Sequence, residues 1–265
     1  MKLNFCSLSS GSSGNCYYLG NEYNGILIDA GIPAGTIRKF LKDQGISMQA
    51  IMGVLVTHNH TDHIRGLELL TRKNNLPVFT THKIWKSIVS RQNLISGITV
   101  HEIGLQQEFH LSGFKIEAFP VSHDAPETVG FHICAEDFKI TIATDLGHIC
   151  QTSAPYIKAA NLLVLESNYD EKMLMNGNYP HFLKARILSD HGHLGNHQTS
   201  AFLAGNVGEN LRHLCLAHLS NNNNTPEIAL QTLQQTFADK GISTNGQLRI
   251  SILNRHMPSE VFSLN

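Results

Sequence analysis

The first thirty residues alternate short apolar runs with turn residues. The runs contain β-branched and aromatic side chains, and Gly, Ser and Asn fill the segments between them, which is typical of strands joined by short connections. We therefore predict an antiparallel meander of three strands, at residues 2–8, 16–19 and 25–29.

Helical spacing and continuous apolar runs follow one another along the rest of the chain. Apolar residues three and four apart predict helices at residues 33–44, 64–73, 83–91, 180–189, 198–207 and 226–240. Apolar runs bounded by turn residues predict strands at residues 54–57, 78–80, 98–102, 108–111, 114–120, 129–134, 139–144, 162–166 and 213–217. This order indicates an α/β fold of two packed mixed sheets with helices on their outer faces, an αββα four-layer sandwich, rather than a doubly wound parallel sheet.

Length and composition indicate one globular domain over residues 1–265. Hydrophobic residues make up 42% of the chain and charged residues 15%, and no apolar run is long enough to span a membrane. The net charge of -1 argues against a broadly basic surface that coats nucleic acid, although it leaves a local basic patch open. Because the N-terminus has no apolar signal region, we predict a cytoplasmic protein without a membrane partner.

Histidine, not cysteine, is the residue type that indicates chemistry. The five cysteines are scattered and form no C-x-x-C pair, which fits reduced core thiols. The 16 histidines exceed what packing requires, and several of them are clustered. The clusters are therefore the first place to look for a functional site.

The densest cluster is His58-Asn59-His60-Thr61-Asp62-His63, between a predicted strand and a predicted helix. Alternate residues that leave a strand can point in one direction, and Asp62 and His63 open the helix, so four potential ligands converge. Imidazole and carboxylate groups suit zinc, manganese or iron. A site with more ligand groups than one tetrahedral ion can use implies a second ion, so we predict a site for two ions.

This run resembles the signature of the metallo-β-lactamase superfamily. Four more segments resemble that family in the right order along the chain: residues 26–31 (ILIDAG), 120–124 (PVSHD), 143–147 (ATDLG) and 216–220 (LAHLS). The resemblance implies two divalent ions, Zn²⁺ or Mn²⁺, and hydrolysis by a metal-bridging hydroxide, with Asp62 among the catalytic residues. It implies the following ligands: His58, His60 and His123 on the first ion, Asp62, His63 and His218 on the second, and Asp145 on both. Asp29 would lie behind the ligands and orient a ligating imidazole.

Two further segments favour phosphodiesters as substrates. Residues 165–168 (LESN) and 190–196 (DHGHLGN) resemble the nucleases and phosphodiesterases of the superfamily. The resemblance implies that Glu166 orients His193, which acts as the general acid for the leaving oxygen. Without the resemblance, the residues alone favour a surface carboxylate at a strand end for Glu166 and a histidine that caps a helix for His193.

The match is most specific to the YycJ/WalJ-like exonucleases of this superfamily. It rests on residues 7–16 (SLSSGSSGNC), 166–170 (ESNYD), 176–180 (NGNYP) and 218–227 (HLSNNNNTPE). This subgroup implies a 5′-to-3′ exodeoxyribonuclease whose partner is nucleic acid, at DNA ends. The Ser/Gly loop at residues 9–15 could bind a phosphate through backbone N–H groups and hydroxyls, or it could be a plain turn. The phosphate contacts that we predict are Ser10, Ser12, Ser13, Asn15 and Ser220.

Several alternatives remain open at this point. Gly195 stands where related sequences usually carry serine, and Asn59 replaces a residue that is commonly acidic. A small phosphodiesterase for cyclic phosphates would share every ligand, whereas in a glyoxalase- or lactonase-type ester hydrolase Glu166 and His193 would be incidental. A binding module without turnover is the non-enzymatic alternative. The 21 residues 124–144 leave no room for the substrate arm of tRNA-processing ribonuclease Z, and the oligomeric state and the metal are not determined by the sequence.

Overall fold

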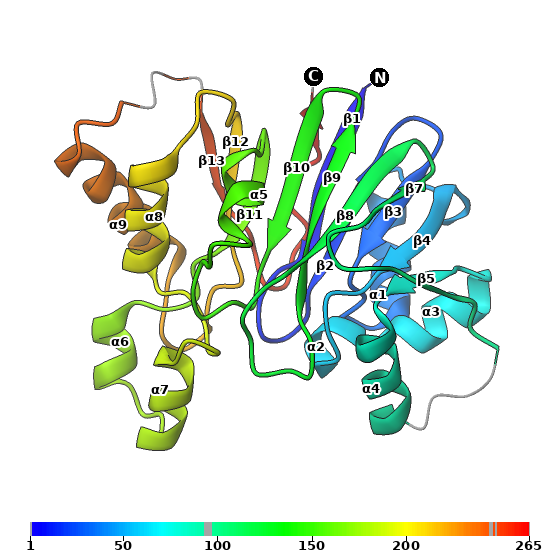
Figure 1. Ribbon diagram of the computed structural model, residues 1–265, viewed down its shortest axis with the longest axis horizontal. Coiled ribbons are helices and arrows are strands. Elements are labelled where there is room, and N and C mark those ends of the chain that lie inside the picture. The colour runs from blue at the N-terminus through cyan, green and yellow to red at the C-terminus, as the bar shows by residue number, and fades with distance from the viewer. Residues whose placement is uncertain (1, 93–96, 244–245, 247, 265) are drawn as a thin grey trace. The chain divides into compact units, whose positions relative to one another are not determined.

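The computed structural model describes residues 2–92, 97–243, 246 and 248–264 of the chain (Figure 1). The chain divides into two compact units. Unit 1 comprises Met1–Ala118, Ala125–Thr128 and Asn254–Asn265, and unit 2 comprises Phe119–Asp124 and Val129–Leu253. The prediction of a single domain stays a prediction.

Among its described residues, the sheet of unit 1 has seven strands in the order β14-β1-β2-β3-β4-β5-β6. The first three strands, β1 (Leu3–Ser9), β2 (Cys16–Gly20) and β3 (Gly25–Ile28), pair antiparallel, as the alternation of apolar runs and turns predicts. The next three, β4 (Ile51–Leu55), β5 (Val78–Thr80) and β6 (Val100–Glu102), continue the sheet in parallel. The C-terminal β14 (Phe262–Leu264) pairs antiparallel with β1, so that Phe262 lies opposite Phe5.

The described part of unit 1 has five helical elements, and a glycine lies between two of them. They are α1 (Ala34–Asp43), the 3-10 helix η1 (Met48–Ala50), α2 (Thr61–Ile64), α3 (Leu67–Asn74) and α4 (His82–Gln92). The sequence predicts one helix at residues 64–73, but the chain forms α2 and α3 with Gly66 between them. A Cβ atom at Gly66 would lie 2.2 Å from the carbonyl oxygen of Ile32. The close approach of these two backbone segments therefore requires glycine there.

The second sheet, most of which belongs to unit 2, has the order β13-β12-β11-β10-β9-β8-β7. Strands β10 to β13 are parallel, whereas β9 pairs antiparallel with β10 and β7 pairs antiparallel with β8. The carboxyl ends of β10, β11 and β12 therefore meet at one edge, where open α/β sheets usually bind their ligands. The strands are β7 (Glu108–Leu111), β8 (Phe114–Pro120), β9 (Val129–Ala135), β10 (Phe138–Ala143), β11 (Leu162–Glu166), β12 (His213–Ala217) and β13 (Arg249–Ile252).

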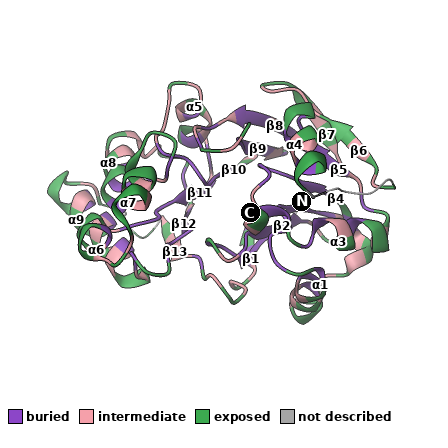
Figure 2. Cartoon of the chain, turned by 90° about the horizontal axis from the view of Figure 1, so that it is seen from below, coloured by how far each residue is buried: buried purple, intermediate pink, exposed green. Residues whose placement is uncertain are grey.

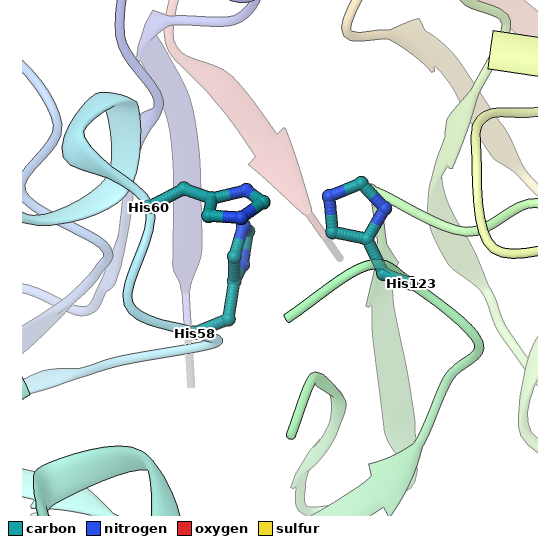
Figure 3. Close-up of side chains that lie close together, drawn as sticks. All are labelled: His58, His60 and His123. Atoms are coloured by element: carbon teal, nitrogen blue, oxygen red, sulfur yellow. The ribbon is translucent and has the colours of Figure 1, made fainter. Parts of the chain in front are cut away.

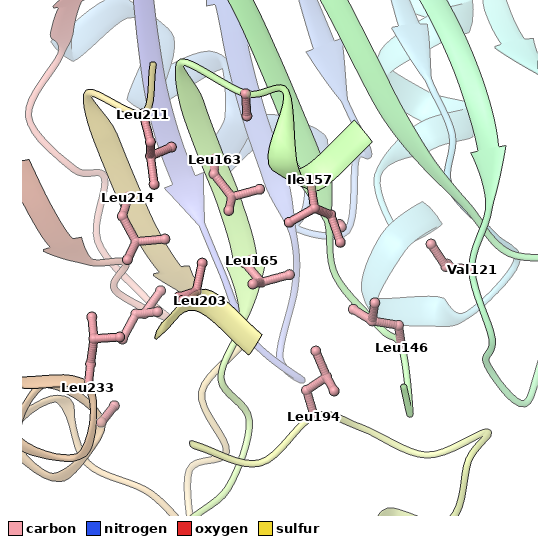
Figure 4. Packing of buried hydrophobic residues seen from close by; sticks show 14 of the residues in the cluster. Val121, Leu146, Ile157, Leu163, Leu165, Leu194, Leu203, Leu211, Leu214 and Leu233 are labelled. Carbon is pink, nitrogen blue, oxygen red and sulfur yellow. The ribbon is translucent and has the colours of Figure 1, made fainter. Parts of the chain in front are cut away.

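The core of unit 2 lies between its parallel strands and two of its helices (Figure 4). Leu163 and Leu214 on neighbouring strands pack in one cluster with Leu203 and Leu233 of the covering helices, and burial of this apolar surface is the main term that stabilises the unit. The helices are α5 (Ala154–Lys158), α6 (Glu171–Asn176), α7 (His181–Leu188), α8 (Asn196–Asn206) and α9 (Pro226–Asp239).

Most strands in the described ranges are buried, whereas β6, β7 and β13 and the outer faces of the helices are exposed or intermediate (Figure 2). Both sheets are mixed and carry helices, which confirms the predicted fold class of an α/β sandwich. No helix in the described ranges is long and apolar enough to cross a membrane.

Candidate metal centre

In unit 1, the cluster His58-Asn59-His60-Thr61-Asp62-His63 follows β4, and the short helix α2 begins within it. His60 is the residue before the first turn of α2, and its carbonyl oxygen accepts a hydrogen bond from the backbone N–H of His63 at 2.9 Å. The ring centroid of His58 lies 4.6 Å from that of His60 and 4.0 Å from that of His63. The strand-to-helix junction therefore gathers three imidazoles, two of which Figure 3 shows on the same loop.

Asp29 lies behind these imidazoles and is completely buried. Its carboxylate accepts hydrogen bonds from the backbone N–H of Thr57 at 2.9 Å, from the Thr57 hydroxyl at 2.9 Å and from His63 Nδ1 at 2.7 Å. The residue has the left-handed backbone conformation, with φ of 60°, directly after β3. Such conformations cost free energy in residues other than glycine and cluster at functional sites.

Thr57 is a site residue that sequence reasoning missed. Its hydroxyl lies 3.0 Å from His58 Nδ1 and donates to Asp29, so it links the carboxylate to a second imidazole. A single polar residue directly after the apolar run of β4 and directly before His58 is the only signal that the sequence offers.

Asn15, predicted as a phosphate contact, lies against His63 instead of solvent. Its Oδ1 accepts from the backbone N–H of Gly11 at 2.9 Å, and this bond orients Nδ2 toward His63 Nε2, also at 2.9 Å. Ser10 is buried as well, with its hydroxyl 2.9 Å from that of Tyr17. Of the five predicted phosphate contacts, only Ser12 is exposed, and Ser13 is half-buried.

In unit 2, the predicted residues stand at one edge of the parallel sheet. Asp145 follows β10, Glu166 is the last residue of β11, and His218 follows β12. Asp145 and His218 have left-handed backbone conformations, with φ of 59° and 55°, as Asp29 has in unit 1. His123 (Figure 3) follows β8, and its Nδ1 lies 3.0 Å from the carbonyl oxygen of Gly192.

Glu166 is the centre of the contacts in unit 2, and it is completely buried. Its Oε1 lies 2.8 Å from His193 Nδ1 and 2.7 Å from His218 Nδ1, while Oε2 accepts from the backbone N–H of Leu146 at 2.9 Å. Asp145 Oδ1 lies 3.5 Å from His218 Nδ1. Asp145, Glu166, His193 and His218 thus form one group whose ligand atoms all lie within 4.8 Å of one another. The sequence associates Glu166 with His193 alone, and the contact with His218 is an addition.

The pKa values in this group follow from burial and from the carboxylates. Burial raises the pKa of Glu166. His193 and, to a smaller extent, His218 lower this pKa by more than burial raises it, so the net pKa lies below its ordinary value. Burial lowers the pKa of His193, but the charge and hydrogen bond of Glu166 outweigh it, and the net pKa is raised. For His123, burial dominates and the pKa is lowered, which favours the neutral imidazole that a metal requires.

The histidines of each unit are oriented as metal ligands are. His58, His63, His123 and His218 each have Nδ1 next to an oxygen: Thr57 Oγ1, Asp29 Oδ2, Gly192 O and Glu166 Oε1, respectively. When Nδ1–H donates to such an oxygen, the lone pair is on Nε2, and this arrangement is the one that ligating histidines almost always adopt. At His63 the amide of Asn15 contacts Nε2, so a bound ion would take the place of that hydrogen bond.

Comparison with known proteins agrees with this chemistry. Residues 24–218 match the family model described as the beta-lactamase superfamily domain, which covers more than half of the chain. The chain belongs to the metallo-β-lactamase superfamily. It is 35% identical to the Exodeoxyribonuclease YycJ of Bacillus anthracis over 98% of this chain and 99% of that protein. It is 32% identical to the Exodeoxyribonuclease WalJ of Streptococcus pneumoniae (strain D39 / NCTC 7466) over 90% of each chain.

The solved structures show the same fold. The metallo-beta-lactamase fold protein YhfI from Bacillus subtilis superposes with a TM-score of 0.73 over 97% of this chain and 98% of that chain. The sequence identity is 14%, so this likeness concerns the fold alone. The family, the fold and the enzyme class of a metal-dependent hydrolase are therefore confirmed, in a YycJ-like member of the metallo-β-lactamase superfamily.

For this metallo-β-lactamase superfamily member, we predict that Asp29→Asn weakens metal binding by about 10- to 100-fold, because His63 loses the carboxylate that orients it. The measurement is a competition titration of metal-stripped protein with Zn²⁺ and a chromophoric chelator. Asp43→Asn is the control, since that carboxylate pairs with Lys39 on the surface. Equal affinities of Asp29→Asn and wild type would contradict the role of Asp29.

Proposed function

We propose that the chain is a 5′-to-3′ exodeoxyribonuclease that hydrolyses phosphodiester bonds at DNA ends with two divalent ions, Zn²⁺ or Mn²⁺. The observation that supports it most is the contact of Glu166 with His193, since a lactonase- or glyoxalase-type reaction has no need of this pair. Two relatives that match nine-tenths or more of the chain carry the name exodeoxyribonuclease, which supports DNA as the substrate.

The proposal keeps the ligands that the family motifs imply, which are His58, His60, Asp62, His63, His123, Asp145 and His218. When bound, two divalent ions would lower the pKa of a water to about 7 and stabilise negative charge on the attacked phosphate. Asp62, whose Oδ2 lies 3.7 Å from His63 Nε2, is the remaining predicted catalytic group.

The protein groups would then handle the leaving oxygen. Because Glu166 engages His193 Nδ1, the proton to be donated is on Nε2 of the protonated ring. The raised pKa of His193 keeps a larger fraction of the ring protonated near neutral pH, as a general acid requires. The 3′-oxygen of the departing nucleotide would take this proton and leave as a hydroxyl. Ser12 and Ser13 remain our proposed phosphate contacts, whereas the burial of Ser10, Asn15 and Ser220 argues for supporting roles.

A digestion panel tests the proposed function. Single- and double-stranded DNA and RNA, labelled at the 5′ or the 3′ end, are incubated with the protein in Mn²⁺ or Zn²⁺. We expect immediate release of a labelled mononucleotide from 5′-labelled DNA and a gradually shortening ladder from 3′-labelled DNA. Intact polymers together with hydrolysis of a cyclic nucleotide would replace the proposal by a small phosphodiesterase, and hydrolysis of thioesters or lactones alone would replace it by an ester hydrolase.

A further inference from the structure

Helix α7 is unusual because none of its residues is buried (Figure 2). Its sequence, HFLKARIL, contains Phe182, Leu183, Ile187 and Leu188, and the side chain of Phe182 is 76% exposed. Helices in proteins owe most of their stability to an apolar face that packs on the rest of the fold. An apolar helix without a buried residue therefore indicates a surface that another molecule covers.

Helix α7 is attached directly to the candidate site of unit 2. The backbone N–H of His193 donates to the carbonyl oxygen of Ile187 at 3.0 Å, just before the C-terminus of the helix. Arg186 Nε donates to Asp124 Oδ2, and the other oxygen of this carboxylate lies 3.2 Å from His123 Nε2. Phe182 and Arg186 are four residues apart and share a face of the helix. The exposed ring of Phe182 therefore lies one helical turn from Arg186, whose partner Asp124 contacts His123.

Helix α7 itself carries two basic side chains, Lys184 and Arg186, and Arg186 is paired with Asp124. Asp170 and Asp190 lie beyond the two ends of the α6–α7 segment. Within α7, the basic residues Lys184 and Arg186 alternate with apolar ones, and no acidic residue occurs. Aromatic side chains on which bases stack, together with cations that follow the backbone, are what proteins use to bind single-stranded nucleic acid.

We propose that α7 is the platform that holds the single-stranded end of a DNA substrate, with a base stacked on Phe182 and the phosphates next to Lys184 and Arg186. This inference rests on the proposed function. A second protein fits the surface less well, because lysine is depleted from the centres of protein interfaces. The link from α7 to His193 and His123 would align the bound strand with the reacting groups.

The first test compares Phe182→Ala with Tyr23→Ala. Tyr23 is the matched control, because its side chain is 77% exposed and lies in unit 1, in the turn between β2 and β3. Binding of a fluorescein-labelled, nuclease-resistant phosphorothioate oligothymidylate to the metal-loaded protein is followed by anisotropy. We expect Phe182→Ala to bind about 10-fold more weakly than wild type, and Tyr23→Ala to bind as wild type does. Both variants should hydrolyse bis(4-nitrophenyl) phosphate at the wild-type rate, which also shows that they are folded.

A second variant, Phe182→Trp, reports stacking directly. It should retain the affinity for the oligonucleotide, and its indole fluorescence should be quenched on binding, while wild type, with Trp85 as its one tryptophan, provides the baseline. If wild type digests DNA but Phe182→Ala binds it as tightly as wild type, the platform is wrong and the proposed function stands. If wild type leaves DNA intact, both are wrong. If Phe182→Ala instead abolishes self-association and leaves DNA affinity unchanged, α7 is a protein interface and the platform is wrong.

Discussion

Replacement of His193 by alanine should lower kcat for DNA by about 10²- to 10⁴-fold, the usual contribution of a general acid, and leave the metal content unchanged. The reason is that His193 is the group that Glu166 orients through Nδ1 in the site of unit 2, and no metal role is assigned to it. Initial rates of nucleotide release at saturating DNA measure kcat, and metal analysis of the same preparation separates loss of the acid from loss of an ion.

A change of leaving group makes this test specific. Nitrophenolate departs without protonation, so His193→Ala should hydrolyse bis(4-nitrophenyl) phosphate nearly as fast as wild type. His191→Ala is the matched control, since this exposed histidine lies two residues away and contacts Ser122. An equal loss on both substrates would show that His193 supports the site as a whole, and no loss on either would remove it from the mechanism.

Glu166→Gln should have an even broader effect, because the carboxylate touches two imidazoles. We expect kcat for DNA to fall by about 10²- to 10⁴-fold, since the acid His193 loses its charged partner. We also expect metal affinity to fall by about 10- to 100-fold, since His218 loses the acceptor for its Nδ1–H. Unlike His193→Ala, this variant should therefore lose activity on bis(4-nitrophenyl) phosphate as well, at limiting metal.

The control for Glu166 is Glu171→Gln, an exposed carboxylate five residues later in α6. Circular dichroism and thermal unfolding monitor the fold, because removal of a buried charge can change stability by several kcal/mol. Activity that returns on the nitrophenyl ester at high metal concentration, but stays low on DNA, is the expected pattern. If Glu166→Gln bound metal and digested DNA as wild type does, the bond to His218 and the bond to His193 would both be without consequence.

Local sequence patterns determined most of the fold. The bounds of β5, β7 and β11 agree residue for residue with the prediction, because each is an apolar or alternating run closed by turn residues. The elements that were missed have weaker local signals. β14 is three residues long and is defined by its pairing with β1 at the other end of the chain, and α6 is a single six-residue stretch. Gly66 reads as a tolerated helix residue until the approach of Ile32 is known.

In the candidate site, too, local motifs predict some of the residues and not others. The histidine and aspartate positions follow from motifs, because a ligand must be a particular residue type at a particular strand end. The supporting contacts do not, because they join segments that are distant in sequence: Thr57 with Asp29, Asn15 with His63, and Glu166 with His218. Asn15 and Ser10 show the limit most clearly, since a loop of Gly and Ser looks like a solvent-facing phosphate loop although these two side chains are buried.

Metal stoichiometry tests the central claim most directly. Inductively coupled plasma mass spectrometry of the gently purified protein should find about two divalent ions per chain. His63→Ala in unit 1 and Asp145→Ala in unit 2 should each reduce the content, whereas His191→Ala should not. Fewer than about one ion per chain in wild type, after dialysis against added Zn²⁺ or Mn²⁺, would contradict the metal centre on which the proposed nuclease depends.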